Sequence, residues 1–374
     1  MRRIGVGEVR IGSKARANVL SALDADRLSY GPFSRDFERR FAGLHMRRFA
    51  CFVNSGTSAL QIGLGALREK HGWRDGDGIL VPAVTFVASI NTITSNGLKP
   101  VVVDVDPEYL DMSVDCAERE LRRHKVVGMM PVNLFGGVAD PRLLQLARAS
   151  HLPTVVDSCE TMFVPTCAEG DVSCFSTYAC HLINTGVGGL ATTNDPDLAY
   201  LIRSLANHGR DGIYRGIDDE LGDAETMAAR FRFERVGYSY RATELEAAIG
   251  CAELDGWEEN IARRQHNADR LSARLAGLPV VIPKVRAGAS ARMMYPILYK
   301  DRDLLTQHLE SLGVETRPLL PITNQPVYRQ WLDEDKYPVA QRVNQQGFYV
   351  GCHQYMSDDD VDYTGIVVKS FFKR

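Results

Sequence analysis

The stretch Phe49-Ala50-Cys51-Phe52-Val53-Asn54-Ser55-Gly56-Thr57-Ser58-Ala59-Leu60 contains the pattern that decides the fold. Its first five residues form a short apolar run typical of a buried strand, and Ala59 and Leu60 begin the apolar face of a helix. The polar residues between them are therefore expected at a helix N-terminus directly after a strand. Backbone N–H groups there make an anion site, so Gly56 and Thr57 are candidate phosphate ligands. The alternative is a plain turn and helix cap.

The alternation of strand and helix continues outward from this stretch. Buried strands are expected at residues 79–81, 101–105, 126–130 and 154–157. Helical patterns lie at residues 13–24, 33–41, 59–67, 87–94 and 141–149, with Ser13 as the expected cap of the first. Near-continuous Val-rich strands separated by helices indicate an α/β fold with a largely parallel sheet covered by helices on both faces.

The pattern changes after about residue 242. A long helical pattern runs from 242 to about 275, with a bend expected near Gly250 or Gly256. Short strands are expected at 280–282, 293–299 and 314–320, around a helix at 303–312. We therefore predict a large domain over residues 1–250 and a smaller α+β domain over residues 251–374. The Gly- and Asp-rich segment 210–234 is predicted to be a long functional loop.

The composition is that of an ordinary soluble chain. The 374 residues are 45% hydrophobic and 24% charged, and the net charge of -3 offers no basic field for nucleic acid. No apolar run approaches the roughly 20 residues needed to cross a bilayer, and the first residues lack the apolar stretch of a secretory signal. We therefore expect a cytoplasmic protein that binds neither nucleic acid nor a membrane.

The eight cysteines do not indicate a disulfide framework, because a chain of this size does not need one. Cys159, Cys167, Cys174 and Cys180 are neighbours in the sequence, so a metal or iron–sulfur site has to be considered. Ligands of such sites usually come in tighter pairs, and the chain contains no CxxC or CxC pair. Small buried side chains are the favoured interpretation, and no metal site is predicted.

Candidate ligand-binding side chains follow two of the expected strands. Phe86 comes after the strand at 79–81, where its ring could stack on a planar ligand or belong to the core. Asp157 ends the strand at 154–157, where an α/β sheet presents its ligands, although it could also cap a helix. Glu160, three residues later, either projects toward the same pocket or is solvated.

The segment Phe175–Gly189 combines a serine, a histidine and three glycines that permit close backbone approach. Ser176 could donate a hydrogen bond to a phosphate. His181 is ambiguous by itself, because a single histidine is more often structural than catalytic. The span 126–283 contains no lysine.

In their order and spacing, these segments resemble the nucleotide-sugar aminotransferases of pyridoxal-phosphate (PLP) fold type I, over essentially the whole chain. The motifs that carry the resemblance are Leu28-Ser29-Tyr30-Gly31-Pro32, residues 54–60, Thr85-Phe86-Val87-Ala88, residues 99–107 and Gly237-Tyr238-Ser239-Tyr240-Arg241-Ala242-Thr243-Glu244-Leu245. The resemblance implies an aspartate-aminotransferase-like fold, with PLP or its amine form PMP as cofactor. It also implies a homodimer with shared active sites, because in this family the segment matching 237–245 reaches into the neighbouring subunit's site.

The resemblance implies a role for each matching residue. Contacts to the cofactor are implied for Gly56, Thr57, Phe86, Asp157, Glu160, Ser176 and Ser239. Phe86 would stack on the pyridine ring, and Asp157 would pair with the ring nitrogen. Ser239 stands where the family usually has Asn. His208 and Arg241 would contact the substrate.

His181 is the decisive departure, because it occupies the position of the lysine that holds PLP in the family. That exchange resembles the 3-dehydratases that make 3-deoxysugars. Residues 157–162, Asp-Ser-Cys-Glu-Thr-Met, are similar to the D-N-C-E-S-M of GDP-4-keto-6-deoxymannose 3-dehydratase, and residues 351–354 to the G-N-H-Q of that subgroup. Val187 stands where the family commonly has Glu. The resemblance therefore implies a cofactor bound non-covalently, without an internal aldimine.

Histidine suits a dehydration because its unperturbed pKa of about 6.5 allows reversible proton transfer near neutrality. We predict that L-glutamate converts PLP to PMP, and that His181 then catalyses loss of the C3 hydroxyl from a nucleotide-linked 4-keto-6-deoxyhexose. The product would be a 4-keto-3,6-dideoxysugar.

Three alternatives stay open. The first is an iron–sulfur-dependent 3-dehydrase with a reductase partner, although this chain lacks the C-x-C pair of that type. The second is an aminotransferase or another PMP-dependent enzyme with an unusual substrate. The third is a non-catalytic protein with the PLP fold, because fold alone does not determine function.

Overall fold

The computed structural model describes residues 3–210, 232–286, 290–319 and 321–373, so most of the predicted loop at 210–234 lies outside the described residues. The helices are α1 Ser13–Asp24, α2 Pro32–Leu44, α3 Gly56–His71, α4 Val87–Ser95, α5 Val114–Arg123, α6 Pro141–Ala149, α7 Pro196–Ala206, α9 Glu244–Glu253, α10 Trp257–Leu275, α11 Arg302–Ser311, α12 Pro338–Gln346 and α13 Asp358–Phe371, with 3-10 turns η1 Ile322–Asn324 and η2 Glu334–Lys336. The strands are β1 Phe49–Val53, β2 Gly78–Pro82, β3 Lys99–Val103, β4 Val126–Met129, β5 Val155–Asp157, β6 Val172–Ser176, β7 Gly189–Thr193, β8 Tyr295–Leu298, β9 Arg317–Pro318 and β10 Gly347–Val350.

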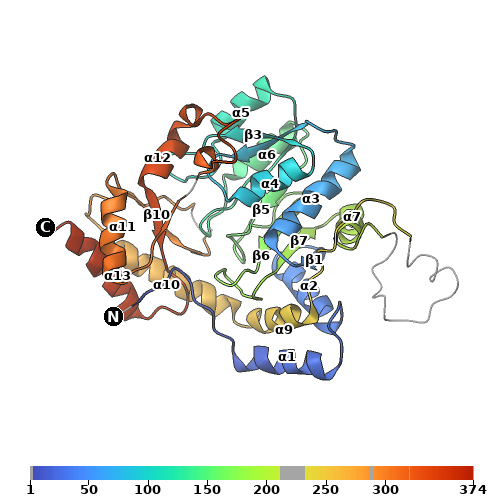
Figure 1. Ribbon diagram of the computed structural model, residues 1–374, viewed down its shortest axis with the longest axis horizontal. Coiled ribbons are helices and arrows are strands. Elements are labelled where there is room, and N and C mark those ends of the chain that lie inside the picture. The colour runs from blue at the N-terminus through green and yellow to red at the C-terminus, as the bar shows by residue number, and fades with distance from the viewer. Residues whose placement is uncertain (1–2, 211–231, 287–289, 320, 374) are drawn as a thin grey trace.

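A mainly parallel sheet forms the centre of the molecule (Figure 1). Strands β3, β2 and β4 are parallel neighbours, and so are β5 and β6. Parallel bridges from Met129 to Thr154 and from Val132 to Asp157 join β4 to β5. Strand β7 runs antiparallel between β6 and β1. The order is therefore β3-β2-β4-β5-β6-β7-β1, which confirms the predicted fold class.

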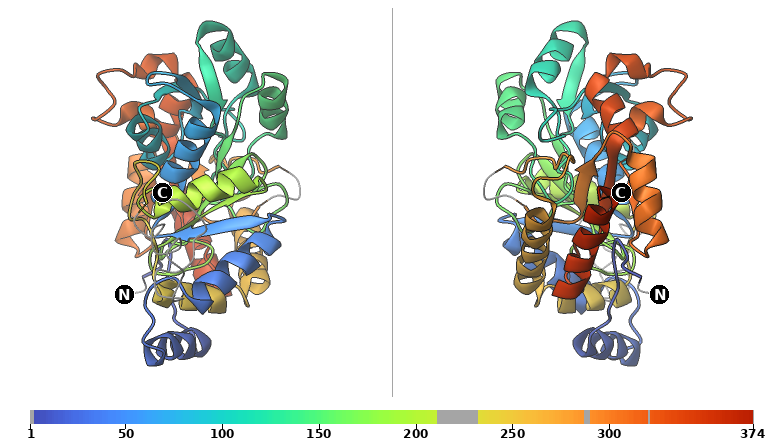
Figure 2. Two further views of the ribbon diagram at one scale, coloured as in Figure 1. Left: turned by 90° about the vertical axis from the view of Figure 1, so that its right-hand side faces the viewer. Right: turned by 90° about the vertical axis from the view of Figure 1, so that its left-hand side faces the viewer.

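Helices cover both faces of this sheet because successive strand residues point to opposite sides. In β2, Ile79 and Val81 pack with apolar residues of α3, α4 and α7, whereas Leu80 packs with α5 and α6. At the β1 end, Phe52 packs instead with α2 and α9. Figure 2 shows the helices on the two sides of the sheet. In the described residues, no helix combines the length and the apolar character needed to span a bilayer.

A smaller antiparallel sheet, β8-β10-β9, lies beside the large one. Its core includes apolar residues of α10, α11 and α13. Ile4 belongs to the same core and forms a parallel bridge with Val314, so the N-terminal segment packs beside the C-terminal helices (Figure 1). The predicted domains at 1–250 and 251–374 stay a prediction.

Three local expectations were wrong. The helix expected as one element over 242–275 is two helices, α9 and α10, although the interruption lies at Gly256, one of the two glycines where a bend was expected. Residues 280–282 form no strand, because only Val281 bridges to Leu298 while β10 pairs along β8. The N-cap of α1 is Gly12 and no side chain caps this helix, so Ser13 is not its cap.

Candidate active site

The carboxyl ends of four strands meet at one edge of the large sheet, where open α/β sheets bind ligands. Strands β1, β2, β5 and β6 all run in the same direction. Strand β7 is antiparallel to both β6 and β1, so β6 and β1 are parallel to each other. Parallel pairings connect β2 through β4 and β5 to β6. Residues 54–57, 83–86, 158–160 and 177–181 follow these ends directly. The sheet therefore gathers the four segments that the sequence singled out.

Gly56 allows the N-terminus of α3 to approach the ends of β5 and β6 closely. A Cβ atom on Gly56 would lie 2.8 Å from the Cβ of Ser176 and 2.8 Å from the Sγ of Cys159. Such contacts are shorter than real Cβ atoms make, so a side chain at Gly56 would push these segments apart. The close packing brings the predicted phosphate ligands Gly56 and Ser176 together.

The start of α3 has backbone donors to offer an anion. Ser55 is the N-cap, and its hydroxyl accepts a hydrogen bond from the N–H of Ser58 at 3.0 Å. Among the described residues, the N–H groups of Gly56 and Thr57 donate to no acceptor. Two free N–H groups at the positive end of a helix form an anion site. Ser55 is thus an ordinary helix cap, but the N–H groups of Gly56 and Thr57 stay available to an anion.

Asp157 is a buried carboxylate without a cation beside it in the described part of the chain. The residue is 4% exposed, and its Oδ2 accepts a hydrogen bond from the Ser89 hydroxyl at 2.7 Å. Its Oδ1 accepts the N–H of Cys159 at 3.1 Å. Burial raises the pKa of Asp157, and the hydrogen bonds oppose this only in part. A cationic ring nitrogen would supply the missing counter-charge.

Phe86 does not belong to the core, because it is 69% exposed. It is the N-cap residue of α4. The hydroxyl oxygens of the neighbouring Thr85 and Ser89 lie 2.7 Å apart, and the Ser89 hydroxyl donates a hydrogen bond to Asp157. Phe86 is therefore an exposed aromatic ring attached to the same first turn that holds the Asp157 carboxylate.

His181 is held by the backbone of the loop after β5. Its Nδ1 lies 2.7 Å from the carbonyl oxygen of Cys159. Because a carbonyl only accepts, Nδ1 carries the proton in the neutral ring, and Nε2 keeps its lone pair. The Tyr178 ring meets the imidazole edge-on, with ring centroids 6.0 Å apart. The structure therefore fixes the tautomer in which Nε2 is the basic nitrogen.

The surroundings of His181 favour its neutral form. The side chain is half-buried, and burial lowers its pKa to about 4. The Cys159 carbonyl opposes this effect, whereas the charge of Arg264 adds to it. This pKa is well below the unperturbed value on which the sequence prediction depended. In the cofactor-free protein His181 is therefore a neutral base at pH 7.

Glu160 is neither solvated nor fully buried. Its Oε2 accepts the N–H of Phe135 at 2.9 Å, which directs the side chain back to the loop after β4. Burial, together with the nearby charge of Asp157, raises the pKa of Glu160 to about 7. Near neutral pH this carboxyl can therefore hold or release a proton.

The remaining predicted residues form a separate, exposed cluster that consists of Ser239, His208 and Arg241. The Nη2 of Arg241 donates to the Ser239 hydroxyl at 3.1 Å and lies 3.3 Å from the Nε2 of His208. Backbone pairing holds the cluster, since His208 donates its N–H to Tyr238 and Asn54 donates its N–H to Tyr240. The cluster is thus attached next to β1, but its side chains face solvent.

Sequence reasoning missed three groups that hold the predicted residues in place. They are the Ser89 hydroxyl on Asp157, the Cys159 carbonyl on His181 and the Arg264 guanidinium on the His181 backbone. Ser89 lies on the helix expected at 87–94, but its contact to Asp157 spans 68 residues, and no local pattern in the sequence indicates it. The other two contacts join distant segments through backbone atoms, for which the sequence has no signal.

The four cysteines that are neighbours in the sequence lie in different surroundings. Cys167 and Cys174 are buried in different core clusters, Cys159 is half-buried and Cys180 is exposed. In the described residues no three His, Cys, Asp or Glu side chains are arranged to hold a metal ion.

The described residues fit the PLP that the sequence predicts. PLP needs an anion site for its phosphate, a surface for its ring and a carboxylate for its ring nitrogen. The free N–H groups of Gly56 and Thr57 match the first, the exposed Phe86 ring the second and the buried, cation-free Asp157 the third.

Comparisons with known proteins agree with this arrangement. The DegT/DnrJ/EryC1/StrS aminotransferase family matches residues 9–369. The chain is 31% identical to GDP-perosamine synthase of Caulobacter vibrioides, over 96% of each chain. It is 25% identical to GDP-4-keto-6-deoxy-D-mannose 3-dehydratase of Escherichia coli, over 94% of this chain and 95% of that relative. A solved structure of an E. coli GDP-4-keto-6-deoxy-D-mannose-3-dehydratase with bound hydrated PLP has the same fold, with a TM-score of 0.90 at 23% identity over 98% of this chain and 100% of that one.

Proposed function

This chain belongs to the DegT/DnrJ/EryC1/StrS aminotransferase family, and from that premise we propose that it removes the C3 hydroxyl of a nucleotide-linked 4-keto-6-deoxyhexose. L-Glutamate is the proposed amino donor, and a 4-keto-3,6-dideoxysugar is the proposed product. The observation that carries the proposal is His181 at the family's lysine position, in a span of residues 126–283 without any lysine. A member that keeps the site but lacks this lysine requires chemistry other than ordinary amination.

Bound PLP or PMP would supply an electron sink and an amino group that alternates with an aldehyde. Gly56, Thr57 and Ser176 would hold its phosphate, and Phe86 would cover its ring. Asp157 would hold the ring nitrogen in its protonated form. Because no lysine stands at position 181, these non-covalent contacts alone would retain the cofactor, and Glu160 and Ser239 would contact it as well.

His181 is the proposed acid–base catalyst. Its Nε2 would remove the proton at C4′ of the cofactor and carry it toward the departing C3 hydroxyl. The Nδ1 contact to the Cys159 carbonyl supports this role, because it leaves Nε2 unprotonated. A pKa of about 4 makes His181 a weak base in the cofactor-free protein. A bound phosphate dianion would raise this pKa toward neutrality, where proton transfer is most efficient.

The overall reaction balances without a further reductant. The sugar exchanges its C3 hydroxyl for hydrogen, which is a two-electron reduction. Glutamate is oxidised to 2-oxoglutarate and supplies those two electrons, and its amino group leaves as ammonia. The oxygen lost from C3 is balanced by the oxygen that 2-oxoglutarate gains through hydrolysis.

Two further properties are proposed with this function. Ser239, His208 and Arg241 would face the active site of a second copy, in a homodimer with shared sites, where His208 and Arg241 would contact the substrate. Their exposure supports this proposal. The proposed location is the cytoplasm, where nucleotide sugars and glutamate are available.

The test uses the purified protein with PLP, glutamate and a panel of GDP-, CDP- and dTDP-4-keto-6-deoxysugars. GDP comes first because two relatives are named for GDP-linked sugars. We expect mass spectrometry to detect loss of the C3 hydroxyl together with 2-oxoglutarate. Borohydride should fix no cofactor to the wild-type protein, whereas His181→Lys should gain a borohydride-stable adduct and lose dehydration. A lysine adduct in the wild type would refute the proposal.

An aminotransferase is the second candidate, because the relative at 31% identity is GDP-perosamine synthase. The same assay separates the two. A product that retains its C3 hydroxyl and carries a new amino group at C4 would establish amination. The missing lysine argues against it, since no other lysine occurs within residues 126–283.

A further inference from the structure

Two consecutive arginines of α10 contact different parts of the protein. Arg263 is half-buried, donates to the carbonyl of Met356 at 2.7 Å and pairs with Asp358 at 2.8 Å. Arg264 is only 1% exposed and contacts neither residue. The two neighbours therefore provide a natural comparison between an outer and an inner guanidinium on one helix.

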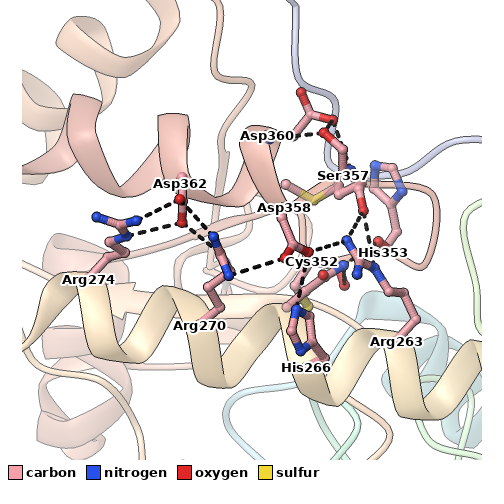
Figure 3. A network of polar contacts seen from close by, with 12 residues as sticks. Arg263, His266, Arg270, Arg274, Cys352, His353, Ser357, Asp358, Asp360 and Asp362 are labelled. Carbon is pink, nitrogen blue, oxygen red and sulfur yellow. Dashed lines mark hydrogen bonds and ion pairs between the residues drawn. The ribbon is translucent and has the colours of Figure 1, made fainter.

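The outer arginines of α10 are matched by carboxylates of α13 (Figure 3). Arg270 pairs with Asp358 at 3.1 Å and with Asp362 at 2.7 Å, and Arg274 pairs with Asp362 at 2.6 Å. In Figure 3 these side chains point from the two helices toward one another. Such partly exposed pairs each contribute little to stability, and their evident role is to attach α13 to α10.

Arg264 has no such partner, since no carboxylate pairs with it in the described part of the chain. Its donors instead contact neutral oxygens: Gln354 Oε1 at 2.8 Å, the Met293 carbonyl at 2.8 Å, the Arg292 carbonyl at 3.4 Å and the His181 carbonyl at 3.3 Å. Burial lowers the pKa of Arg264. A buried cation without an anion is costly, and an apolar residue would avoid that cost. The burial of the Arg264 cation therefore needs a functional or structural benefit that offsets this cost.

The contacts of Arg264 join three segments around the proposed acid–base residue. Met293 precedes β8, Gln354 belongs to the 351–354 motif and His181 follows β6. The guanidinium holds the backbone of His181, while the Cys159 carbonyl holds its ring. His181 is therefore held at two points, and one of them is Arg264 of α10, which also bonds to Gln354 of the 351–354 motif.

We propose that Arg264 is a positioning residue for His181: its planar guanidinium fixes the His181 backbone against Gln354 and Met293, so that the imidazole is aimed at the reacting atoms. This inference rests on the proposed function, in which His181 moves the proton. It also gives the 351–354 motif a physical role, because Gln354 Oε1 accepts a hydrogen bond from the Nε of Arg264 and so helps to orient the guanidinium.

The charge of Arg264 acts on His181 as well. The groups that face the imidazole in the described residues are the Cys159 and Ser176 backbone, the Tyr178 ring and the Arg264 cation. Arg264 disfavours the imidazolium and thereby keeps the ring in its basic form. Geometry and charge can be separated, because lysine keeps the charge but lacks the planar fork.

The experiment compares Arg264→Met and Arg264→Lys with the matched control Arg263→Met in the full-length protein. Loaded with PMP in D₂O, each variant is followed by NMR for exchange of the cofactor C4′ protons, and PMP affinity is measured separately. We expect Arg264→Met to slow exchange at least about tenfold, with PMP affinity within about threefold of wild type. The pH midpoint of exchange should move upward in Arg264→Met, because the charge that lowers the pKa of His181 is lost. Arg264→Lys keeps that charge, so its midpoint should not change, although its exchange should also be slow. Arg263→Met should exchange within about twofold of wild type.

Measuring His181→Asn alongside separates the positioning role of Arg264 from the proposed proton transfer by His181. Wild-type exchange in folded Arg264→Met and Arg264→Lys, with exchange lost in His181→Asn, would overturn the positioning role alone. Persistent exchange in His181→Asn would instead overturn the proposed function. If Arg264→Met does not fold, as judged by circular dichroism, Arg264→Lys decides: slow exchange at an unchanged pH midpoint supports the inference, and a wild-type rate refutes it.

Discussion

The group at the strand ends and the exposed cluster differ in how far the chain itself satisfies their polar atoms. Asp157 is 4% exposed and accepts two hydrogen bonds, and the His181 imidazole is fixed by a carbonyl. Arg241, in the cluster with Ser239 and His208, is exposed, and its guanidinium bonds only to these two neighbours among the described residues. The polar groups of the first region are therefore held in place by the chain itself, whereas the Arg241 guanidinium of the second keeps N–H donors that a ligand can use.

The physical origin of this difference is where each region sits on the scaffold. The first group follows the ends of buried parallel strands, whose register the core fixes. The cluster lies on the segments after α7 and before α9, and in the part of the chain that the structure describes one isolated bridge, between Val53 and Arg241, joins them to β1. Substitutions in the first group should therefore affect cofactor binding and chemistry, and those of His208 and Arg241 in the cluster should affect substrate binding.

The largest effect is expected for His181→Asn. Asparagine cannot move a proton, and general acid–base residues contribute about 10²- to 10⁴-fold to turnover. We expect a loss of dehydration in that range, with cofactor binding retained, measured as 3-deoxy product per unit time. Normal turnover in this variant would remove His181 from the reaction and with it the distinction between the two regions.

The next effect is expected for Asp157→Asn. A hydrogen bond to a charged group contributes about 1.5–3 kcal/mol, so cofactor affinity should fall by about 10- to 100-fold, measured by fluorescence titration with PMP. Ser89→Ala is the matched comparison: it removes a hydrogen bond to the carboxylate but leaves the carboxylate itself, so it should lower PMP affinity less than Asp157→Asn. Equal affinities in wild type and Asp157→Asn would contradict the assignment.

A pH effect should follow from the lowered pKa of His181. Burial moves this pKa from 6.5 to about 4, so below pH 6.5 the unfolded chain binds the proton more readily than the folded chain. The free energy of unfolding should therefore decrease as the pH falls from 6.5 to 4. In His181→Asn without cofactor this decrease should be smaller by about 1–2 kcal/mol, allowing for partial exposure. Urea unfolding at several pH values measures it, and identical slopes in both proteins would refute it.

A smaller effect is expected for Phe86→Ala. Aromatic stacking contributes about 0.5–1.5 kcal/mol, so PMP affinity should fall by about two- to tenfold. Because Phe86 is 69% exposed, the melting temperature of the cofactor-free protein should not change. A lower melting temperature with unchanged affinity would mean that Phe86 supports the fold and not the cofactor.

The smallest effect is expected in the exposed cluster. Arg241→Ala should raise the KM for the nucleotide sugar up to about fivefold, the range of an exposed ionic contact, and leave PMP affinity unchanged. Ser239→Ala is the matched comparison, because it removes the neighbouring proposed cofactor contact, and it should lower PMP affinity and leave the KM for the nucleotide sugar unchanged. If PMP affinity fell in Arg241→Ala as much as in Asp157→Asn, Arg241 would belong to the cofactor site and not to the substrate site.

The fold was predictable where strands are Val-rich and less so elsewhere. Strands covered on both faces give continuous apolar runs, which revealed β2 to β5. Strands β6, Val172–Ser176, and β7, Gly189–Thr193, are also fully buried but rich in Ser, Thr and Gly. Their hydroxyls bond to neighbouring backbone, as Thr192 does to the Ser173 carbonyl at 3.2 Å. Apolar periodicity therefore had no signal for them or for the reversed direction of β7.

The same limit applies to the candidate site. Gly56, Phe86, Asp157 and Ser176 lie at strand ends, where the order of motifs along the chain indicates them. The groups that hold them come from segments remote in sequence. Ser89 reaches Asp157 across 68 residues, and no local pattern encodes such a contact.

The sequence by itself determined the chemical inventory of the site: histidine in place of lysine at position 181, and no lysine throughout residues 126–283. Only the tertiary structure decided how that histidine behaves. The Cys159 carbonyl sets its tautomer from 22 residues away, burial lowers its pKa to about 4, and Arg264 holds its backbone from 83 residues away. Residue identity belongs to the chain, but desolvation and hydrogen bonding depend on which distant atoms the fold brings together.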